Sequence, residues 1–200
     1  MTEEKRDASG VKEAVLEAFR GGRERVGELP SAVGRVLEDA WAGLDGVVEE
    51  ERAAHFARVL DAAADGVARG AEALKLAVGE ARSRGQGFRR TELEGAAEDL
   101  LALEALFTER IGELIGEGRA VGGAAAKDLR QHAGRLAADL KQPLGEAVET
   151  LRREPLGLAR DSARVAAGAS RKAAGSLLSS LGAALDRLGG RVAGRDEKPD

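Results

Sequence analysis

Two histidines and a run of three glutamates are the side chains in this 200-residue chain with the clearest potential for acid–base or metal chemistry. Neither His55 nor His132 lies in a His-x-x-x-His or Glu-x-x-His pair, so metal binding is only weakly indicated. His132 falls between Leu129 and Leu136, which predicts a partly buried structural imidazole. His55 follows Glu51 by four residues, so we expect an ion pair on a helix surface.

The remaining chemical signals are weak. Glu49, Glu50 and Glu51 are consecutive, so on a helix they point in different directions and form a solvated face. Gly85 and Gly87 lack the third glycine and the preceding strand of a dinucleotide site, and no serine lies in a nucleophile elbow. Because the chain has no cysteine, thiol and zinc–thiolate chemistry are excluded. We expect no enzyme activity, no cofactor, no metal and no small-molecule substrate.

The composition of the chain limits which partners it can bind and where in the cell it is expected. Charged residues make up 33% of the chain, mix both signs through most of it, and sum to a net charge of −4, while aromatic residues are 2%. Mixed charge without aromatic platforms argues against a nucleic acid partner. No apolar run is long enough to span a bilayer, and the charged N-terminus does not resemble a secretory signal. We expect a cytoplasmic protein, with peripheral association with a membrane or granule as an option.

Helix is the only secondary structure that the residue pattern supports, because β-branched and aromatic residues are few. Two long helices are predicted, at Ser31–Arg84 and Thr91–Gln142. Ser31 is a plausible N-cap of the first, and Thr91 and Glu94 have the spacing of a capping box at the start of the second. Breaks or kinks are expected at two prolines, Pro143 and Pro155. They are also expected at closely spaced glycines, which are Gly21-Gly22, Gly85–Gly87 and Gly122-Gly123.

The fold class that follows is all-α, an elongated bundle built on an antiparallel hairpin of the two long helices. We divide the chain into a charged N-terminus with a short helix (1–30), the main hairpin or bundle (31–153), a basic C-terminal amphipathic helix (154–194) and a disordered tail (195–200). The apolar residues are mainly alanine and leucine, so such thin helices are expected to need a partner helix, a second copy or an apolar surface.

The spacing of the apolar residues in the first long helix is an eleven-residue repeat. Its stripe is Phe56, Val59, Ala63, Val67, Gly70, Leu74, Val78 and Ala81. Eleven residues in three turns keep one face pointing the same way in a nearly straight helix. The second helix starts nearer to a heptad, with Leu100, Leu103, Phe107, Ile111 and Leu114. The longer period suits a flat surface, and the heptad suits helix partners.

Three glycine pairs have the small-xxx-small spacing that lets helix backbones approach closely. They are Gly66/Gly70, Gly112/Gly116 and Gly118/Gly122. With 27 glycines in the chain such pairs also arise by chance, and the other interpretation is that glycine keeps the free helices marginal until they bind.

The C-terminal part differs from the rest in charge. Residues 152–195 hold nine basic and three acidic residues, a net charge of about +6 against about −10 for the remainder. Basic residues beside a leucine stripe are typical of a segment that lies on a membrane or granule surface. The candidate surface-binding residues are Leu177, Leu181, Leu185, Leu188 and Val192, flanked by Arg187 and Arg191. The alternative is that this face packs on the acidic helices of the same chain.

Long, cysteine-free, alanine-rich helices with eleven-residue periodicity resemble phasins, which coat polyhydroxyalkanoate granules, and also apolipoprotein-type and late-embryogenesis-abundant helices. The stretch Phe56–Ala63 carries the resemblance, which covers about residues 33–192. It implies an amphipathic coat on a lipid or polyester surface. Unlike phasins, this chain is rich in glycine and lacks an Ala/Lys/Pro-rich tail, and an uncharacterised bacterial helical family fits equally.

Three functional hypotheses therefore follow from the sequence. The first is peripheral association with an apolar or anionic surface, in the manner of a phasin. The alternative is a structural helical bundle that acts through homo-oligomerisation or protein partners. A third is a stress-protective protein that is partly disordered in dilute buffer. The high glycine and charge contents favour this hypothesis.

Overall fold

The computed structural model describes residues 3–21, 28–84, 88, 90–117, 122–153 and 184, and these form helices and short connections without a strand. The predicted all-α class is confirmed. The elements are α1 (Glu3–Gly21), α2 (Glu28–Ala42), α3 (Glu49–Ser83), α4 (Arg90–Ala105), the π-helical turn η1 (Leu106–Arg110), α5 (Ile111–Glu117) and α6 (Gly123–Arg153).

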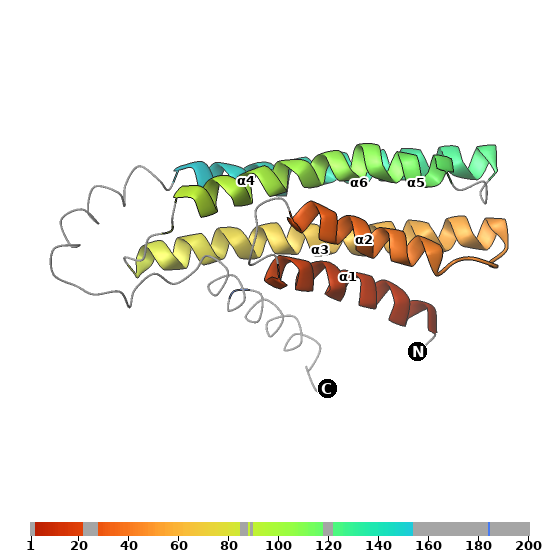
Figure 1. The fold of residues 1–200 in the computed structure, drawn as a ribbon, viewed down its shortest axis with the longest axis horizontal. Helices are drawn as coiled ribbons and strands as arrows, with labels where there is room; N and C mark the ends of the chain where they lie inside the picture. Colours follow the sequence, from red (N-terminus) through yellow and green to blue (C-terminus); the bar gives the residue numbers. More distant parts are fainter. Residues whose placement is uncertain are drawn as a thin grey trace, which may run out of the picture.

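Helix directions alternate along the chain, with α4, η1 and α5 forming one continuous rod (Figure 1). Contacts between distant residues fix the relative directions. Lys12 pairs with Asp65, and further along α1, Phe19 lies against Gly70, so α1 and α3 are parallel. His132 lies beside Asp61 and Glu146 binds Lys75, so α3 and α6 are parallel as well.

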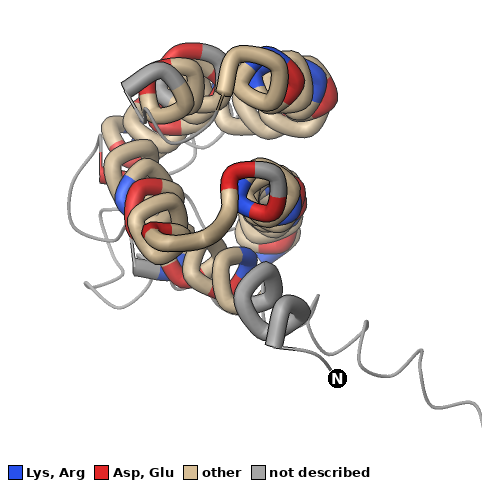
Figure 2. The backbone as a smooth tube through the Cα atoms, turned by 90° about the vertical axis from the view of Figure 1, so that its right-hand side faces the viewer, with Lys and Arg blue, Asp and Glu red and all other residues tan. Residues whose placement is uncertain are grey.

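Four rods enclose the core in a closed ring. Helix α2 contacts α3, α3 contacts α6, α6 contacts α4 and α5, and α4 contacts α2. The end view in Figure 2 shows these rods around a common interior, with α1 on the outside against α2 and α3. The ring therefore closes without α1, which is an added fifth element.

The core explains why these residues form these helices. All eight members of the eleven-residue stripe of α3 are buried inside the bundle, so the predicted stripe is the inner face of a helix that has neighbours on several sides. The largest fully buried side chains include Phe56, Phe107, Leu60 and Leu100. Trp41 of α2 packs edge-on against Phe56, with ring centroids 4.6 Å apart. These contacts hold α2 against α3.

Both predicted long helices are divided in the structure. Ser31–Arg84 is interrupted at residues 43–48, where Gly46 adopts a φ of +88° that favours glycine, and Ser31 lies inside α2 instead of capping it. Thr91–Gln142 is interrupted between α5 and α6, at the predicted glycine pair. Conversely, α6 runs through Pro143 to Arg153, so no break occurs at this proline, and the alternative of a kink stays a prediction. Packing of the flanking core leucines, Leu140 and Leu144, holds the helix through the proline.

These divisions change which helices pair. The two predicted segments do pack on each other, mainly through α3 and α6, but these two helices are parallel. Each segment also folds back on itself, α2 against α3 and α4–α5 against α6.

The π-helical turn η1 changes which positions of the second rod face the core. Leu100, Leu103, Phe107 and Ile111 are buried as predicted, but the next inward residue is Ile115 and Leu114 is only half-buried. A π turn holds more residues than an α turn, which moves the inward face one residue along the chain.

Candidate functional site

Helix α1 packs closely on α3 at two glycines. The side chain of Val15 lies over Gly66, and the ring of Phe19 lies over Gly70. A Cβ atom at Gly66 would be 2.9 Å from Val15 Cγ1, and one at Gly70 would be 2.5 Å from the Phe19 ring. Both distances are shorter than real Cβ contacts, so only glycine allows this approach. We call the α3 surface formed by Gly66, Gly70 and Asp65 the α1 seat.

A charged contact lies beside this seat. Lys12 Nζ is 2.6 Å from Asp65 Oδ2, and Arg69 Nε donates to Asp65 Oδ1 at 3.1 Å. Burial raises the pKa of Asp65, but the hydrogen bonds from Lys12 and Arg69 outweigh it and hold that pKa below its ordinary value. The Asp65 carboxylate therefore stays ionised and fixes the register of α1 on α3.

The three glycine pairs predicted as contact motifs have different outcomes. Gly66/Gly70 is a true close contact. Gly112 has open space where a Cβ would stand, and Gly122 meets the Glu49 carboxylate rather than a helix backbone. Gly118 lies outside the described residues. The equal four-residue spacing of Val15/Phe19 and Gly66/Gly70 is the sequence signal that could have identified α1 as the partner.

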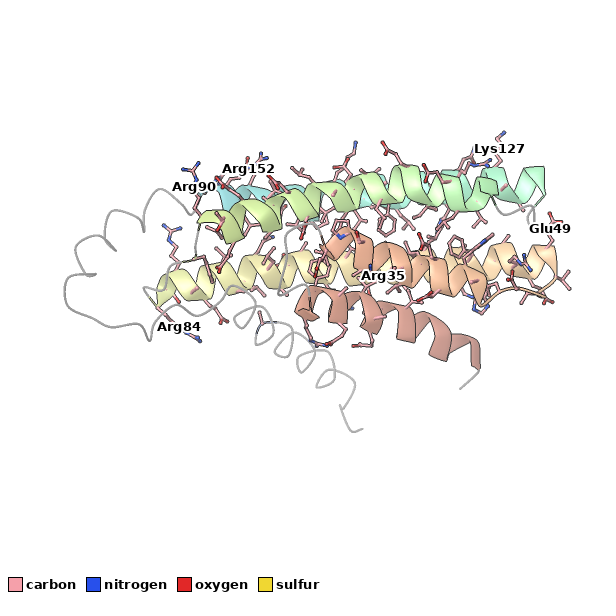
Figure 3. All side chains as sticks on the ribbon, in the orientation of Figure 1. Arg35, Glu49, Arg84, Arg90, Lys127 and Arg152 are labelled. Carbon is pink, nitrogen blue, oxygen red and sulfur yellow. The ribbon has the colours of Figure 1, made fainter. Side chains whose placement is uncertain are left out.

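The acidic run at the start of α3 has a structural role that the sequence did not reveal. The Glu49 carboxylate accepts a hydrogen bond from the Gly122 backbone N–H, just before α6 begins. Since α3 and α6 are parallel, their positive N-terminal dipole ends lie side by side, and Glu49 offsets both. Figure 3 shows Glu49 and Lys127 at this end of the bundle and Arg84, Arg90 and Arg152 at the other.

A second cross-link joins α3 and α6 further along. Lys75 Nζ binds Glu146 Oε2 at 2.7 Å and Glu72 Oε2 at 2.8 Å. The hydrogen bond that Lys75 donates to Glu146, followed by the one to Glu72, raises the pKa of Lys75. The bond from Lys75, followed by that from Gln142, lowers the pKa of Glu146. Both directions agree with an ion pair formed at neutral pH.

A shallow groove of about 290 Å³ lies between α3 and α6, and His132 is one of its lining residues. The lining is Ala53, Ala54, Ala57, Ala125, Asp128, Leu129, His132 and Arg135. His132 is partly buried, and its Nε2 lies 2.8 Å from Asp61 Oδ1 without hydrogen-bond geometry. His55 Nδ1 lies 3.4 Å from Arg58 Nη2. Within the described ranges no group of three potential metal ligands occurs.

The predicted surface-binding residues, Leu177, Leu181, Leu185, Leu188, Val192, Arg187 and Arg191, lie outside the described residues. Their described neighbour Ala184 is 3% exposed and belongs to the hydrophobic core cluster. Among the helices that the structure describes, none has the length and apolar character needed to cross a membrane.

Fold and contacts thus define an all-α bundle with a helix-binding surface on α3. A family model described as a family of unknown function, DUF6781, matches residues 2–185, nearly the whole chain, and the protein belongs to this family. The expectation of an uncharacterised helical family is thereby confirmed, whereas the resemblance to phasins gains no support. No curated protein and no solved structure matches the chain.

Replacement of Gly70 tests the seat. Gly70→Ala places a methyl group against the Phe19 ring, so we expect a loss of about 1–3 kcal/mol of unfolding free energy. The matched control is Gly79→Ala on the same helix, where a Cβ meets nothing within 4 Å. Alanine there should stabilise the chain by up to about 1 kcal/mol. Urea unfolding followed by circular dichroism measures both, and equal effects of the two changes would exclude a tight seat.

Acid should weaken the seat through Asp65. Because its folded pKa lies below the ordinary 3.8, its contribution to stability is complete above that value and is lost as the pH falls through the folded pKa. Wild type should therefore lose more stability than Asp65→Asn between pH 7 and about 2.5. Asp139→Asn, at an exposed position of α6, is the control and should behave like wild type. Identical pH profiles for wild type and Asp65→Asn would contradict the assignment.

Proposed function

We propose that this chain is a non-enzymatic helical bundle that acts by binding helices, through homo-oligomerisation or protein partners. The observation that carries the proposal is the α1 seat. There, two glycines admit Val15 and Phe19 at a distance no other residue allows, and an ion pair at the edge of the seat fixes the register. Such a surface selects one helix pattern, an apolar and an aromatic residue four apart with a lysine three residues earlier.

Burial of the α3 stripe supports a preformed bundle over a coat that folds on a surface. Phe56, Val67 and Leu74 are enclosed by neighbouring helices of the same chain, so this stripe is not available to a flat surface while the bundle is intact. The large apolar residues that remain exposed among the described positions are Val48, Leu76 and Leu101, one on each of three segments. Scattered exposed residues do not form a surface-binding face.

Circular dichroism with and without anionic vesicles, together with light-scattering mass over a range of concentrations, tests the proposal. We expect high helicity in buffer that vesicles leave unchanged, and a mass of a dimer or larger. Low helicity in buffer that rises sharply on vesicles would instead favour the surface-coat function. A monomeric mass at every concentration would contradict self-assembly.

The second candidate function is peripheral association with an apolar or anionic surface, as a phasin-like granule or membrane coat. One observation favours it. Arg84, Arg90 and Arg152 lie at one end of the bundle (Figure 3), where Arg84 and Arg90 also pair with Glu80 and Glu94. In the sequence, the basic segment 154–194 comes directly after α6. Adjacent basic charge attracts anionic head groups, and the leucine stripe of that segment would supply apolar burial.

Charge introduced into that stripe tests the second candidate. Leu181→Glu together with Leu185→Glu should abolish binding to anionic vesicles in a sedimentation assay, because two carboxylates would enter the apolar layer. The matched control is Val48→Glu with Leu101→Glu, since both residues are exposed on the bundle. Vesicle binding that survives the first pair of changes would rule out this segment as the anchor.

A further inference from the structure

Helix α1 is the one long helix of the described part that lies outside the closed ring of α2, α3, α6 and α4–α5, and its main contacts are with α3 and α2. Of its described side chains, three are buried, Val15, Leu16 and Phe19. The seat beneath α1 is part of α3, which also contacts α6 and α2. The contacts that close the ring, α2 with α3, α3 with α6, α6 with α4 and α5, and α4 with α2, do not include α1.

The length of chain between α1 and α2 permits α1 to leave its own bundle. Helix α1 ends at Gly21 and α2 begins at Glu28, and the sequence between them contains glycine at both ends, Gly22 and Gly27. Six residues can span up to about 20 Å. A copy of α1 can therefore leave its own bundle and reach the α3 helix of a neighbouring chain while its α2 stays in place.

We propose that the α1 seat takes α1 from a second copy of this chain, so that two chains exchange their first helices. The inference rests on the proposed self-assembly and specifies which helices would form the contact between the two chains. The occupant is specified by the contacts within the chain: Lys12 to Asp65, Val15 to Gly66 and Phe19 to Gly70. Exchange reproduces each of these contacts twice in a two-fold dimer and needs no other complementary surface.

Two single-cysteine variants test the exchange, because the natural chain has no cysteine. The cysteines are placed at the charged contact beside the seat, where Lys12 Nζ lies 2.6 Å from Asp65 Oδ2 and no glycine is replaced. Lys12→Cys in one chain and Asp65→Cys in another come within reach of a short bifunctional thiol cross-linker only if the helices exchange. The variants carry different tags, are mixed as full-length chains and are cross-linked. The mixed cross-linked dimer should exceed either same-variant dimer by about fivefold or more and grow with concentration. Mixed and same-variant dimers in equal yield would overturn the proposal.

A charge swap gives a second test without cysteines or cross-linking. Lys12→Glu alone and Asp65→Lys alone each place like charges across the seat in their own chain. When the two variants are mixed, exchange pairs the two substituted side chains with each other at one seat, as opposite charges. The other seat regains the natural pair of Lys12 and Asp65. The mixed dimer should therefore form about fivefold more than either dimer of one variant. A mixture that behaves as the sum of its components would overturn the proposal.

Light-scattering mass of the wild-type chain separates the two levels of inference. A dimeric mass without preferred mixed dimers would overturn helix exchange and leave self-assembly standing. A monomeric mass at all concentrations would overturn both.

Discussion

The structure depends on how closely other helices can approach α3. Its faces carry alanine and glycine at the contact positions, and Ala63, Ala71 and Ala77 are fully buried there. Small residues lower the apolar area that each contact buries, but they allow helices to approach closely and more of them to surround α3. The many close dispersion contacts compensate for the scarcity of large buried side chains. Helices α1, α2 and α6 all pack on α3 as a result. This explains how a chain with 2% aromatic residues can form a continuous core.

Parallel packing of α3 with α6 creates an electrostatic cost that charged residues offset. The two N-termini lie together, and the Glu49 carboxylate binds at the start of α6. The two C-termini lie together at the opposite end, where Arg84 and Arg152 are found (Figure 3). Acidic residues at N-termini and basic residues at C-termini each stabilise the helix dipole. The positions of Glu49, Arg84 and Arg152 thus have a structural explanation in the helix dipoles.

The sequence predicts the local features of this fold well and its long-range pairing poorly. The α3 stripe and the breaks near Gly85 and Gly122 follow from residue pattern and glycine chemistry. The turn at residues 43–48 does not, because an isolated glycine such as Gly46 is tolerated in helices and the return of α2 depends on Trp41 meeting Phe56. The contact of Gly66 and Gly70 with α1 could have been predicted from the matching four-residue spacing of Val15 and Phe19. The hydrogen bond between Glu49 and Gly122 could not, because its prediction requires knowing that α3 and α6 are parallel. The candidate residues around Leu181 stay a prediction.

Hydrogen exchange of the backbone amides of the intact chain tests the central claim, that α3 is the helix on which the others are assembled. Amides that require global unfolding exchange last, whereas a peripheral helix exchanges through local opening. The account predicts that residues 56–78 of α3 are the most protected and that α1 opens earlier, at a lower free energy. Exchange of these α3 amides as fast as those of α1 would contradict it.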